Sequence, residues 1–189
     1  MSDLYLDSRK TALVAIDLQN AILGLDTGPY PATEVVQRNR QIADHLRARG
    51  GLVVWVRVNL KQFMQLPADE PSPLASKPLP DELSEIAPSA GFQAGDLLVT
   101  KRHWGAFAGT PLEQELRSRG IDTVVLTGIS TNAGVESTLR QGTGLGLGFV
   151  VVKDACSGQD AEEHRFAVQK IFPRLARVRT TEEVLQALA

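Results

Sequence analysis

Five short apolar runs, separated by segments with helical character, constrain the fold of this chain more than any other feature. The runs occupy residues 11–17, 52–58, 97–100, 123–127 and 149–152. Their hydrophobicity is nearly continuous instead of alternating, which is typical of strands buried on both faces of a parallel sheet. The repeated order of strand, helix and strand therefore predicts an α/β fold with a doubly wound sheet.

Helix signals lie between these runs. Residues 34–49 carry apolar positions among charged ones, and two glycines follow them. The sequence Thr-Pro-Leu-Glu at 110–113 predicts a capping box with proline at the first helical position, and Thr-Thr-Glu-Glu at 180–183 predicts a second capping box. Because open α/β sheets bind ligands beyond the carboxyl ends of their strands, polar residues at those ends are candidates for a site.

Length and composition exclude several classes of protein. The 189 residues suit one domain, residues 1–189. With 22 acidic and 20 basic residues the net charge is -2, so we expect no nucleic acid partner. The apolar runs fall far short of the roughly 20 residues that span a bilayer, and the charged N-terminus is unlike a signal peptide. We therefore expect no membrane partner and a cytoplasmic location.

Two segments interrupt the rhythm of strands and helices. Residues 59–95 contain several prolines and little periodicity, and a stretch this long is usually functional. We interpret it as an ordered cover over the site or an interface arm, and we expect a homodimer or homotetramer.

Residues 141–148 contain four glycines, but they precede a strand instead of joining a strand to a helix. We therefore predict a turn there and not a phosphate-binding loop.

Two charged residues close apolar runs. Asp17 ends the first run, where its carboxylate could face a ligand or cap a turn. Lys101 follows residues 97–100, where a buried ammonium would need an anionic partner and a solvated one would not. Asp17 is the natural partner. Trp104 and Phe107 follow closely and could form a pocket wall, although each alone is typical of a core.

Residues 127–140 (TGISTNAGVESTLR) predict the turn from a strand into a helix. The helix is expected to begin near residues 130–132, so that free backbone N–H groups and the positive end of its dipole face the site. That arrangement suits an oxyanion or a substrate carboxylate. Simple capping of the helix by Ser130 or Thr131 is an alternative that could hold at the same time.

Three segments together resemble the isochorismatase-like hydrolase superfamily, also called the cysteine hydrolases. They are residues 11–20 (TALVAIDLQN), residues 100–132, which begin TKRHWGAF and end TGISTN, and residues 150–158 (VVVKDACSG). The resemblance spans nearly the whole chain. It implies a Rossmann-like, mainly parallel sheet of about six strands with helices on both faces. It also implies a site that contains an Asp, a Lys and, in the amidases of the family, a nucleophilic Cys.

The chain departs from the amidase pattern at the nucleophile position. Where those members read TGxxTNxCV, this chain reads TGISTNAGV, so the cysteine is replaced by Gly134. The single cysteine, Cys156, lies after the next strand and is interpreted as a small buried residue. A covalent thiolate mechanism therefore lacks its nucleophile. The resemblance then implies membership of a subgroup with Gly at this position.

The histidines do not suggest a metal site. His45, His103 and His164 are dispersed along the chain, and residues 56–63 lack metal-ligand spacing, so neither the zinc of many nicotinamidases nor another cofactor is expected. His45 and His164 are interpreted as surface residues of helices. His103 neighbours Lys101 and is a candidate for the site.

We therefore predict a hydrolase that acts on a small anionic metabolite without a covalent cysteine intermediate. Isochorismatases also carry Gly where the amidases carry Cys, and the resemblance implies hydrolysis of a vinyl ether by protonation of its enol carbon. That chemistry needs a carboxylic acid with a raised pKa, although a neighbouring Lys lowers the pKa of an Asp. The predicted site consists of Asp17 and Lys101 as catalytic groups, and of Ser130, Asn132, Gly134, His103, Trp104 and Phe107 as substrate-binding groups.

Two other functions remain open. The chain could be a non-catalytic small-molecule binding protein that kept the family's pocket after it lost the cysteine. It could also be an amidase that uses Asp17 as a base to activate water directly. The discriminating observation is whether Asp17 and Lys101 pair in a closed cleft with a bound small anion, or whether the pocket is filled by side chains.

Overall fold

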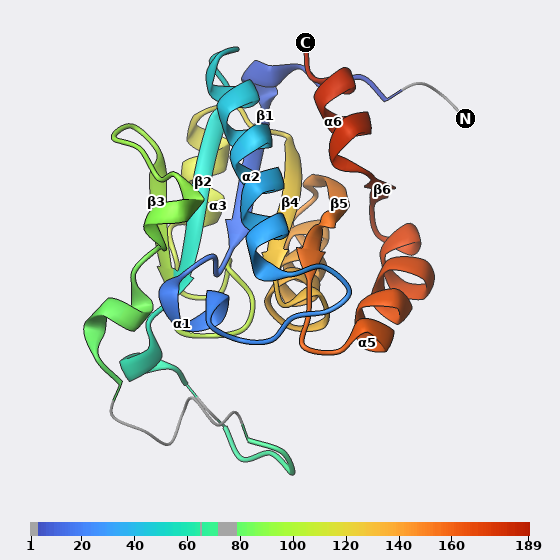
Figure 1. Ribbon diagram of the computed structural model, residues 1–189. Coiled ribbons are helices and arrows are strands. Elements are labelled where there is room, and N and C mark those ends of the chain that lie inside the picture. Colours follow the sequence, from blue (N-terminus) through green and yellow to red (C-terminus); the bar gives the residue numbers. More distant parts are fainter. Residues whose placement is uncertain (1–3, 65, 72–78) are drawn as a thin grey trace.

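The computed structural model describes residues 4–64, 66–71 and 79–189, and it contains one six-stranded parallel sheet (Figure 1). The order across the sheet is β3-β2-β1-β4-β5-β6, and every paired neighbour runs parallel. The strands are β1 (Thr11–Ile16), β2 (Leu52–Val58), β3 (Leu97–Lys101), β4 (Thr123–Ile129), β5 (Gly148–Ser157) and β6 (Arg177–Arg179). The α/β fold with a doubly wound parallel sheet is confirmed.

Helices cover both faces of this sheet (Figure 1). The α-helices are α1 (Asn20–Leu23), α2 (Ala32–Arg47), α3 (Leu112–Ser118), α4 (Glu136–Gly144), α5 (Ala161–Phe166) and α6 (Thr181–Ala187). Two π-helical turns, η6 (Thr131–Val135) and η7 (Ala167–Ile171), precede α4 and follow α5. Buried residues of α2 and α6 pack on one face of the sheet, and those of α3, α4 and η7 pack on the other. No helix among the described residues is long and apolar enough to cross a membrane.

The continuous hydrophobicity of the strands follows from this double cover. Within β1, Leu13 and Ala15 join the core under α2, whereas Val14 and Ile16 join the core under α3 and α4. All four side chains are fully buried. Since successive residues of a strand point to opposite faces, a strand covered on both faces needs apolar residues at every position.

The strand order places a ligand-binding edge between β1 and β4. From β1 the chain builds outward to β2 and β3 on one side, and then returns to build β4, β5 and β6 on the other. Open α/β sheets bind ligands at the carboxyl ends of the strands where the order reverses. Asp17 directly follows β1 and η6 follows β4, so both lie at that edge.

Two local expectations are wrong. The capping box at 110–113 is not formed, because α3 begins at Leu112 and the Glu113 carboxylate instead accepts a 2.8 Å hydrogen bond from Arg117. The turn predicted for residues 141–148 starts later, because α4 continues to Gly144. A Cβ on Gly142 would overlap the Phe149 ring, so this glycine lets the helix pack closely on β5. The capping box of Thr180 with Glu183 is confirmed.

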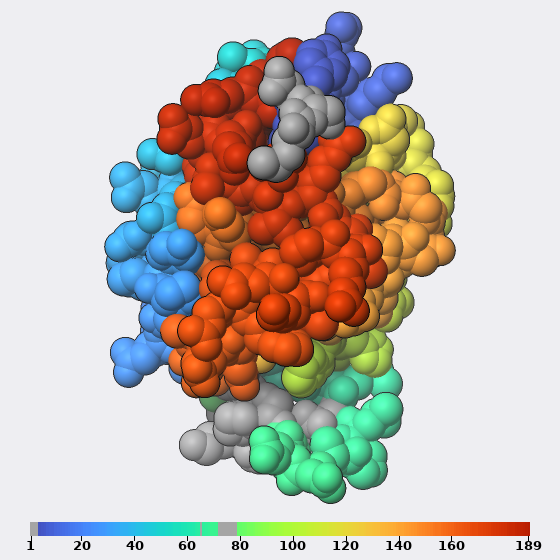
Figure 2. Space-filling model, turned by 90° about the vertical axis from the view of Figure 1, so that its right-hand side faces the viewer, coloured from blue at the N-terminus to red at the C-terminus, as the bar shows by residue number. Residues whose placement is uncertain are grey.

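The described part of residues 59–95 leads from the carboxyl end of β2 to the amino end of β3 and is partly organised. It contains the short 3-10 helices η2 (Leu60–Gln62), η4 (Asp81–Ser84) and η5 (Pro88–Ala90), while residues 65 and 72–78 lie outside the described residues. Residues 66–71, blue-green in Figure 2, stand out from the body of the molecule.

The second half of this stretch is fastened to the segment that follows Asp17. The Gln19 side chain donates to the carbonyls of Val58 and Leu83, each at 3.2 Å. The backbone N–H of Ala87 donates to the carbonyl of Leu18 at 3.0 Å. Residues 83–87 therefore support the candidate edge of the sheet. The role of residues 59–95 as an interface arm stays a prediction.

Candidate active site

Asp17 and Lys101 form a buried ion pair at the carboxyl edge of the sheet. Lys101 Nζ lies 2.8 Å from Asp17 Oδ2, and Lys101 and Asp17 are only 2% and 6% exposed. Lys101 Nζ also donates to the His103 carbonyl at 3.0 Å. The second carboxylate oxygen, Asp17 Oδ1, is buried and has no hydrogen-bond partner among the described residues. A buried oxygen without a partner needs an explanation, and a bound group is one.

The backbone holds Asp17 in an uncommon conformation. Its φ angle is 55°, and no other non-glycine residue among those described has a positive φ. Asp tolerates this left-handed region better than most side chains, at a cost of about 1–2 kcal/mol. The backbone N–H of Asp17 donates to the Val56 carbonyl at 2.8 Å, which is the last hydrogen bond from β1 to β2. Unusual backbone of this kind is common at functional sites.

Two opposing forces act on the pKa of Asp17. Burial raises the pKa of this carboxyl above its ordinary value, and the opposing attraction of the Lys101 ammonium does not outweigh it. The sequence left this balance open, because a neighbouring Lys lowers the pKa of an Asp while removal from water raises it. A carboxyl with a raised pKa can act as a general acid at a pH where an exposed Asp cannot.

Gly134 faces the same carboxylate. A Cβ built on this residue would lie 3.3 Å from Asp17 Oδ2 and 2.9 Å from Ile16 Cγ2. Any side chain at position 134 would therefore point toward the ion pair, and even its Cβ would press on Ile16, so the glycine lets this turn pack closely against the end of β1. Asp17, Lys101 and Gly134 thus converge, as the strand ends at this edge predict.

The segment after Lys101 is fixed against α4. The N–H of Ala106 donates to Thr138 Oγ1 at 3.0 Å, and Thr138 Oγ1 donates in turn to the Gly134 carbonyl at 2.7 Å. The N–H of Phe107 donates to Gln141 Oε1 at 3.1 Å. Thr138 therefore links the turn that carries Gly134 to the segment that carries His103 and Trp104.

The aromatic candidates in this segment differ in placement. The Trp104 side chain is 51% exposed, and its carbonyl lies 3.5 Å from the position of a Cβ on Gly134. Phe107 is half-buried and packs on the core under α4, which is the alternative that the sequence left open for it. His103 is half-buried and reaches the ion pair through its backbone carbonyl.

The two polar candidates after β4 also differ in placement. The Ser130 carbonyl accepts hydrogen bonds from the N–H groups of Ala133 and Val135, each at 3.2 Å, and its side chain does not cap the helix. The Asn132 side chain is turned toward α5, where its amide donates to Glu163 Oε2 at 2.7 Å. The capping role considered for Thr131 is not observed either.

Thr131 instead contacts a residue that the sequence interpretation placed wrongly. His164 on α5 is only 5% exposed and is not a surface residue. Its Nδ1 lies 2.8 Å from Thr131 Oγ1, and its ring meets the edge of the Tyr30 ring at a centroid distance of 5.9 Å. His164 therefore anchors the start of the turn that carries Gly134. His164 lies three residues before the apolar Ala167, a spacing that puts both on one face of a helix. That spacing was the sequence signal for its burial.

We expect this anchor to make folding stability depend on pH. Burial lowers the pKa of His164 below its ordinary value of about 6.5. The unfolded chain therefore binds a proton more readily, so the free energy of unfolding falls as the pH falls from about 6.5 toward the folded-state pKa. Urea unfolding of wild type and His164→Gln between pH 5 and 8 measures this. A His164→Gln chain that loses as much stability on acidification as wild type would contradict it.

Cys156 is a buried residue of β5, as the sequence suggested. Its exposed fraction is zero, and its sulfur lies 4.0 Å from the Leu126 carbonyl. Burial raises the pKa of this thiol above its ordinary value. A neutral buried thiol is neither a nucleophile nor a metal ligand.

The folded chain is therefore expected to resist thiol reagents. Iodoacetamide at pH 8 should leave Cys156 unmodified in the native protein and modify it fully in about 6 M guanidinium chloride, because only the unfolded thiol is accessible. Intact-protein mass spectrometry reads the result. Alkylation of the native chain at the unfolded rate would show that Cys156 is accessible.

A zinc site does not fit the described residues. No group of three or more His, Cys, Asp or Glu side chains in residues 4–64, 66–71 and 79–189 is placed to hold a metal ion. The only charged partner that Asp17 contacts there is Lys101. No step of a mechanism is therefore derived through a metal.

Comparisons with known proteins agree with this geometry. The family model described as the isochorismatase domain matches residues 11–183. The isochorismatase family protein YecD of Escherichia coli O157:H7 is 47% identical, over 98% of this chain and 100% of its own. YwoC of Bacillus subtilis strain 168, from the same family, is 42% identical over 98% of each chain. The structure of an isochorismatase family protein from Burkholderia thailandensis superposes with a TM-score of 0.92, at 40% identity over 98% of each chain.

The fold and the edge site define a Rossmann-like α/β protein with a buried ion pair of Asp17 and Lys101 at the switch point of its sheet. The chain belongs to the isochorismatase family of hydrolases.

Proposed function

We propose that this chain hydrolyses a small anionic metabolite without a covalent cysteine intermediate. The observation that carries the proposal is the glycine at position 134, whose missing side chain would point at the buried pair of Asp17 and Lys101. The proposal assigns the chain to a subgroup of the family with Gly at the nucleophile position. The whole chain, residues 1–189, then acts as a single hydrolase domain.

Asp17 is assigned the role of general acid and base. In its protonated form it transfers a proton to the enol carbon of a vinyl ether, which leaves an oxocarbenium ion that water attacks. The attacking water gives a proton back to the Asp17 carboxylate. The hemiketal then collapses to a ketone as its C–O bond to the ring oxygen breaks, and that oxygen takes up the proton of the hemiketal hydroxyl. The raised pKa of Asp17 supports this role because it keeps a proton available at higher pH. Its unpartnered Oδ1 is the oxygen free to reach a substrate.

Lys101 is assigned the role of charge partner. When Asp17 gives up its proton, the new carboxylate lies 2.8 Å from the ammonium, so the pair stabilises the state that forms during the reaction. Lys101 itself is almost fully buried and acts through Asp17. Contacts to substrate are assigned to Ser130, Gly134, His103 and Trp104, but not to Asn132, which is bonded to Glu163, or to Phe107, which packs on the core.

A panel of substrates tests the proposal. It contains vinyl ethers with carboxylates, including isochorismate, together with amides and carbamoyl compounds. Each is assayed with wild type, Asp17→Asn and Gly134→Cys. Turnover of a vinyl ether by wild type that disappears in Asp17→Asn supports acid catalysis without a nucleophile. Turnover of amides by wild type contradicts the vinyl-ether assignment and favours direct activation of water by Asp17. Tight binding of a panel compound without turnover favours a binding protein.

A further inference from the structure

A hollow that the proposed mechanism does not use lies between the segment of Tyr30, strand β5 and the helices α5 and η7. Its volume is about 450 Å³, within the range of about 300–1,000 Å³ that is common for small-molecule sites. None of the residues in its wall belongs to the ion pair of Asp17 and Lys101. The polar ones are Tyr30, Lys153, Glu162, His164, Arg165 and Gln169.

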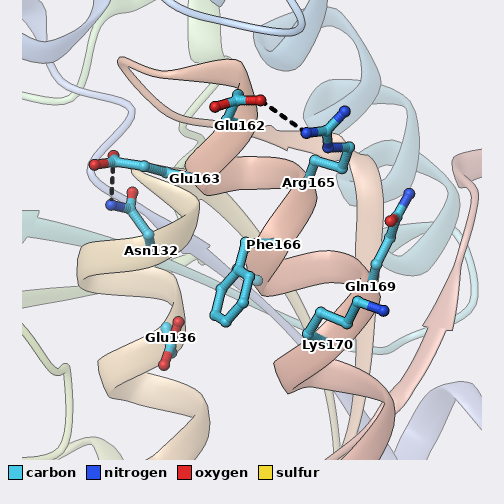
Figure 3. Close-up of a pocket in the computed structure, with 9 residues that line it drawn as sticks. Asn132, Glu136, Glu162, Glu163, Arg165, Phe166, Gln169 and Lys170 are labelled. Carbon is cyan, nitrogen blue, oxygen red and sulfur yellow. Dashed lines mark hydrogen bonds and ion pairs between the residues drawn. The ribbon is translucent and has the colours of Figure 1, made fainter.

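This hollow lies on the side of α5 that is turned away from Asn132. Figure 3 shows Arg165 and Gln169 on that side, while Glu163 reaches toward Asn132 on the other. A larger hollow of about 660 Å³ on the Asn132 side contains acidic and basic side chains together, and its Glu136 and Glu163 are already bonded to other side chains. The larger hollow therefore favours neither sign of ligand charge.

Positive charge predominates in the smaller hollow. Lys153 on β5 is half-buried and makes no hydrogen bond or ion pair with any described residue. Its field reaches the Glu183 carboxylate, which the capping box of α6 already holds. Arg165 is paired with Glu162 at 2.8 Å, but these side chains are 62% and 83% exposed, so the pair is weak. Because an ammonium withdrawn from water needs a counter-charge, Lys153 favours an anionic ligand.

His164 supplies a second donor to the same hollow. It is only 5% exposed, and its Nδ1 lies 2.8 Å from Thr131 Oγ1. Its other ring nitrogen, Nε2, has no hydrogen-bond partner in the part of the chain that the structure describes, and it is not sealed in the interior. Since the ring forms part of the wall, a molecule in the hollow can reach Nε2. When the Thr131 hydroxyl donates to Nδ1, the neutral ring carries its proton on Nε2 and can donate it there.

We propose that this hollow binds a small anion, a phosphate or a carboxylate, through the Lys153 ammonium and the Nε2–H of His164. Hydrogen bonds from an ammonium to such oxygens are charge-assisted and therefore strong. The same imidazole ring contacts Thr131, the first residue of η6, and Gly134 lies three residues further on. A bound anion that moves the ring therefore changes the surroundings of Gly134.

NMR titration with inorganic phosphate and with citrate tests this site. Wild type labelled with ¹⁵N is titrated at constant ionic strength and about pH 7.5, where burial keeps the His164 ring neutral. The ring nitrogen shifts should identify Nε2 as the protonated nitrogen. The ring and the Gly134 amide should shift together and saturate, with a dissociation constant of about 1 mM for at least one of the two anions.

Variants separate a specific site from general attraction of anions. Lys153→Gln should raise the dissociation constant at least about tenfold, whereas Lys153→Arg should keep binding within about threefold of wild type. Lys170→Gln is the matched control, because it removes an exposed lysine that lines only the larger hollow, and it should leave binding unchanged. Thr131→Val should keep the shift of the His164 ring and lose that of the Gly134 amide.

Four results would overturn the proposal. They are a ring that carries its proton on Nδ1, no saturable shift with either anion up to about 50 mM, equal weakening by Lys153→Gln and Lys170→Gln, and a Gly134 amide that still shifts fully in Thr131→Val. The titration uses no substrate, so its outcome is independent of the proposed hydrolysis.

Discussion

Replacement of Lys101 by methionine is expected to lower the free energy of unfolding by about 3–5 kcal/mol at pH 7. The ammonium is buried and lies 2.8 Å from Asp17 Oδ2, so its removal leaves a carboxylate in the interior with no partner of opposite charge. The loss should shrink as the pH falls toward about 4, because protonation of Asp17 then costs little in the variant. Urea unfolding of both proteins at several pH values measures this.

An exposed ion pair supplies the control for this experiment. Lys61 Nζ lies 2.7 Å from Asp81 Oδ1, but these side chains are 50% and 79% exposed. Lys61→Met should therefore change stability by less than about 1 kcal/mol. The double variant Asp17→Asn with Lys101→Met should recover most of the loss, since no unpaired charge remains. Equal losses for Lys101→Met and Lys61→Met would mean that burial of the pair has no energetic consequence.

Replacement of Asp17 by asparagine is expected to lower kcat/KM for the best vinyl ether by about 10²–10⁴-fold. Asparagine has nearly the same shape as aspartate, but it cannot donate the proton that the proposed reaction requires. The wild-type pH profile should also lose activity as the pH rises through the pKa of Asp17, which burial raises. Steady-state kinetics across the pH range measures both effects.

Asp81→Asn is the matched control, because it makes the same chemical change on an exposed carboxylate. It should leave kcat/KM and the pH profile unchanged. If Asp17→Asn kept full activity while its fold was intact, the catalytic assignment of Asp17 would be wrong, whatever the substrate.

The sequence predicted the parts of this molecule that depend on continuous hydrophobicity and strand ends. Strands covered on both faces are apolar at every position, as β1 shows, so their locations could be read directly. Asp17 and Lys101 each follow such a run, and the carboxyl ends of parallel strands share one edge. Their pairing was therefore predictable, whereas the direction of the Asp17 pKa depended on how deeply the pair is buried.

Features that depend on packing between distant segments could not be read in this way. Gly142 has the sequence context of a turn, but its function in the fold is to let α4 approach Phe149. His164 looked like a surface residue of a polar helix, yet Thr131 and Tyr30 contact it in the interior. The three-residue strand β6 is too short and too polar to carry a strand signal. In each case the deciding neighbour lies elsewhere in the sequence.

The mass of the intact protein during turnover tests most directly the central claim that hydrolysis proceeds without a covalent intermediate. The substrate is the compound of the panel that wild type turns over fastest, and samples are quenched in acid within the first turnovers and at steady state. We predict that the mass stays that of the unmodified chain at every time and that product forms without a burst, because Gly134 offers no nucleophile and Cys156 is buried. A species heavier by the substrate-derived group, formed and lost at the rate of turnover, would contradict the claim.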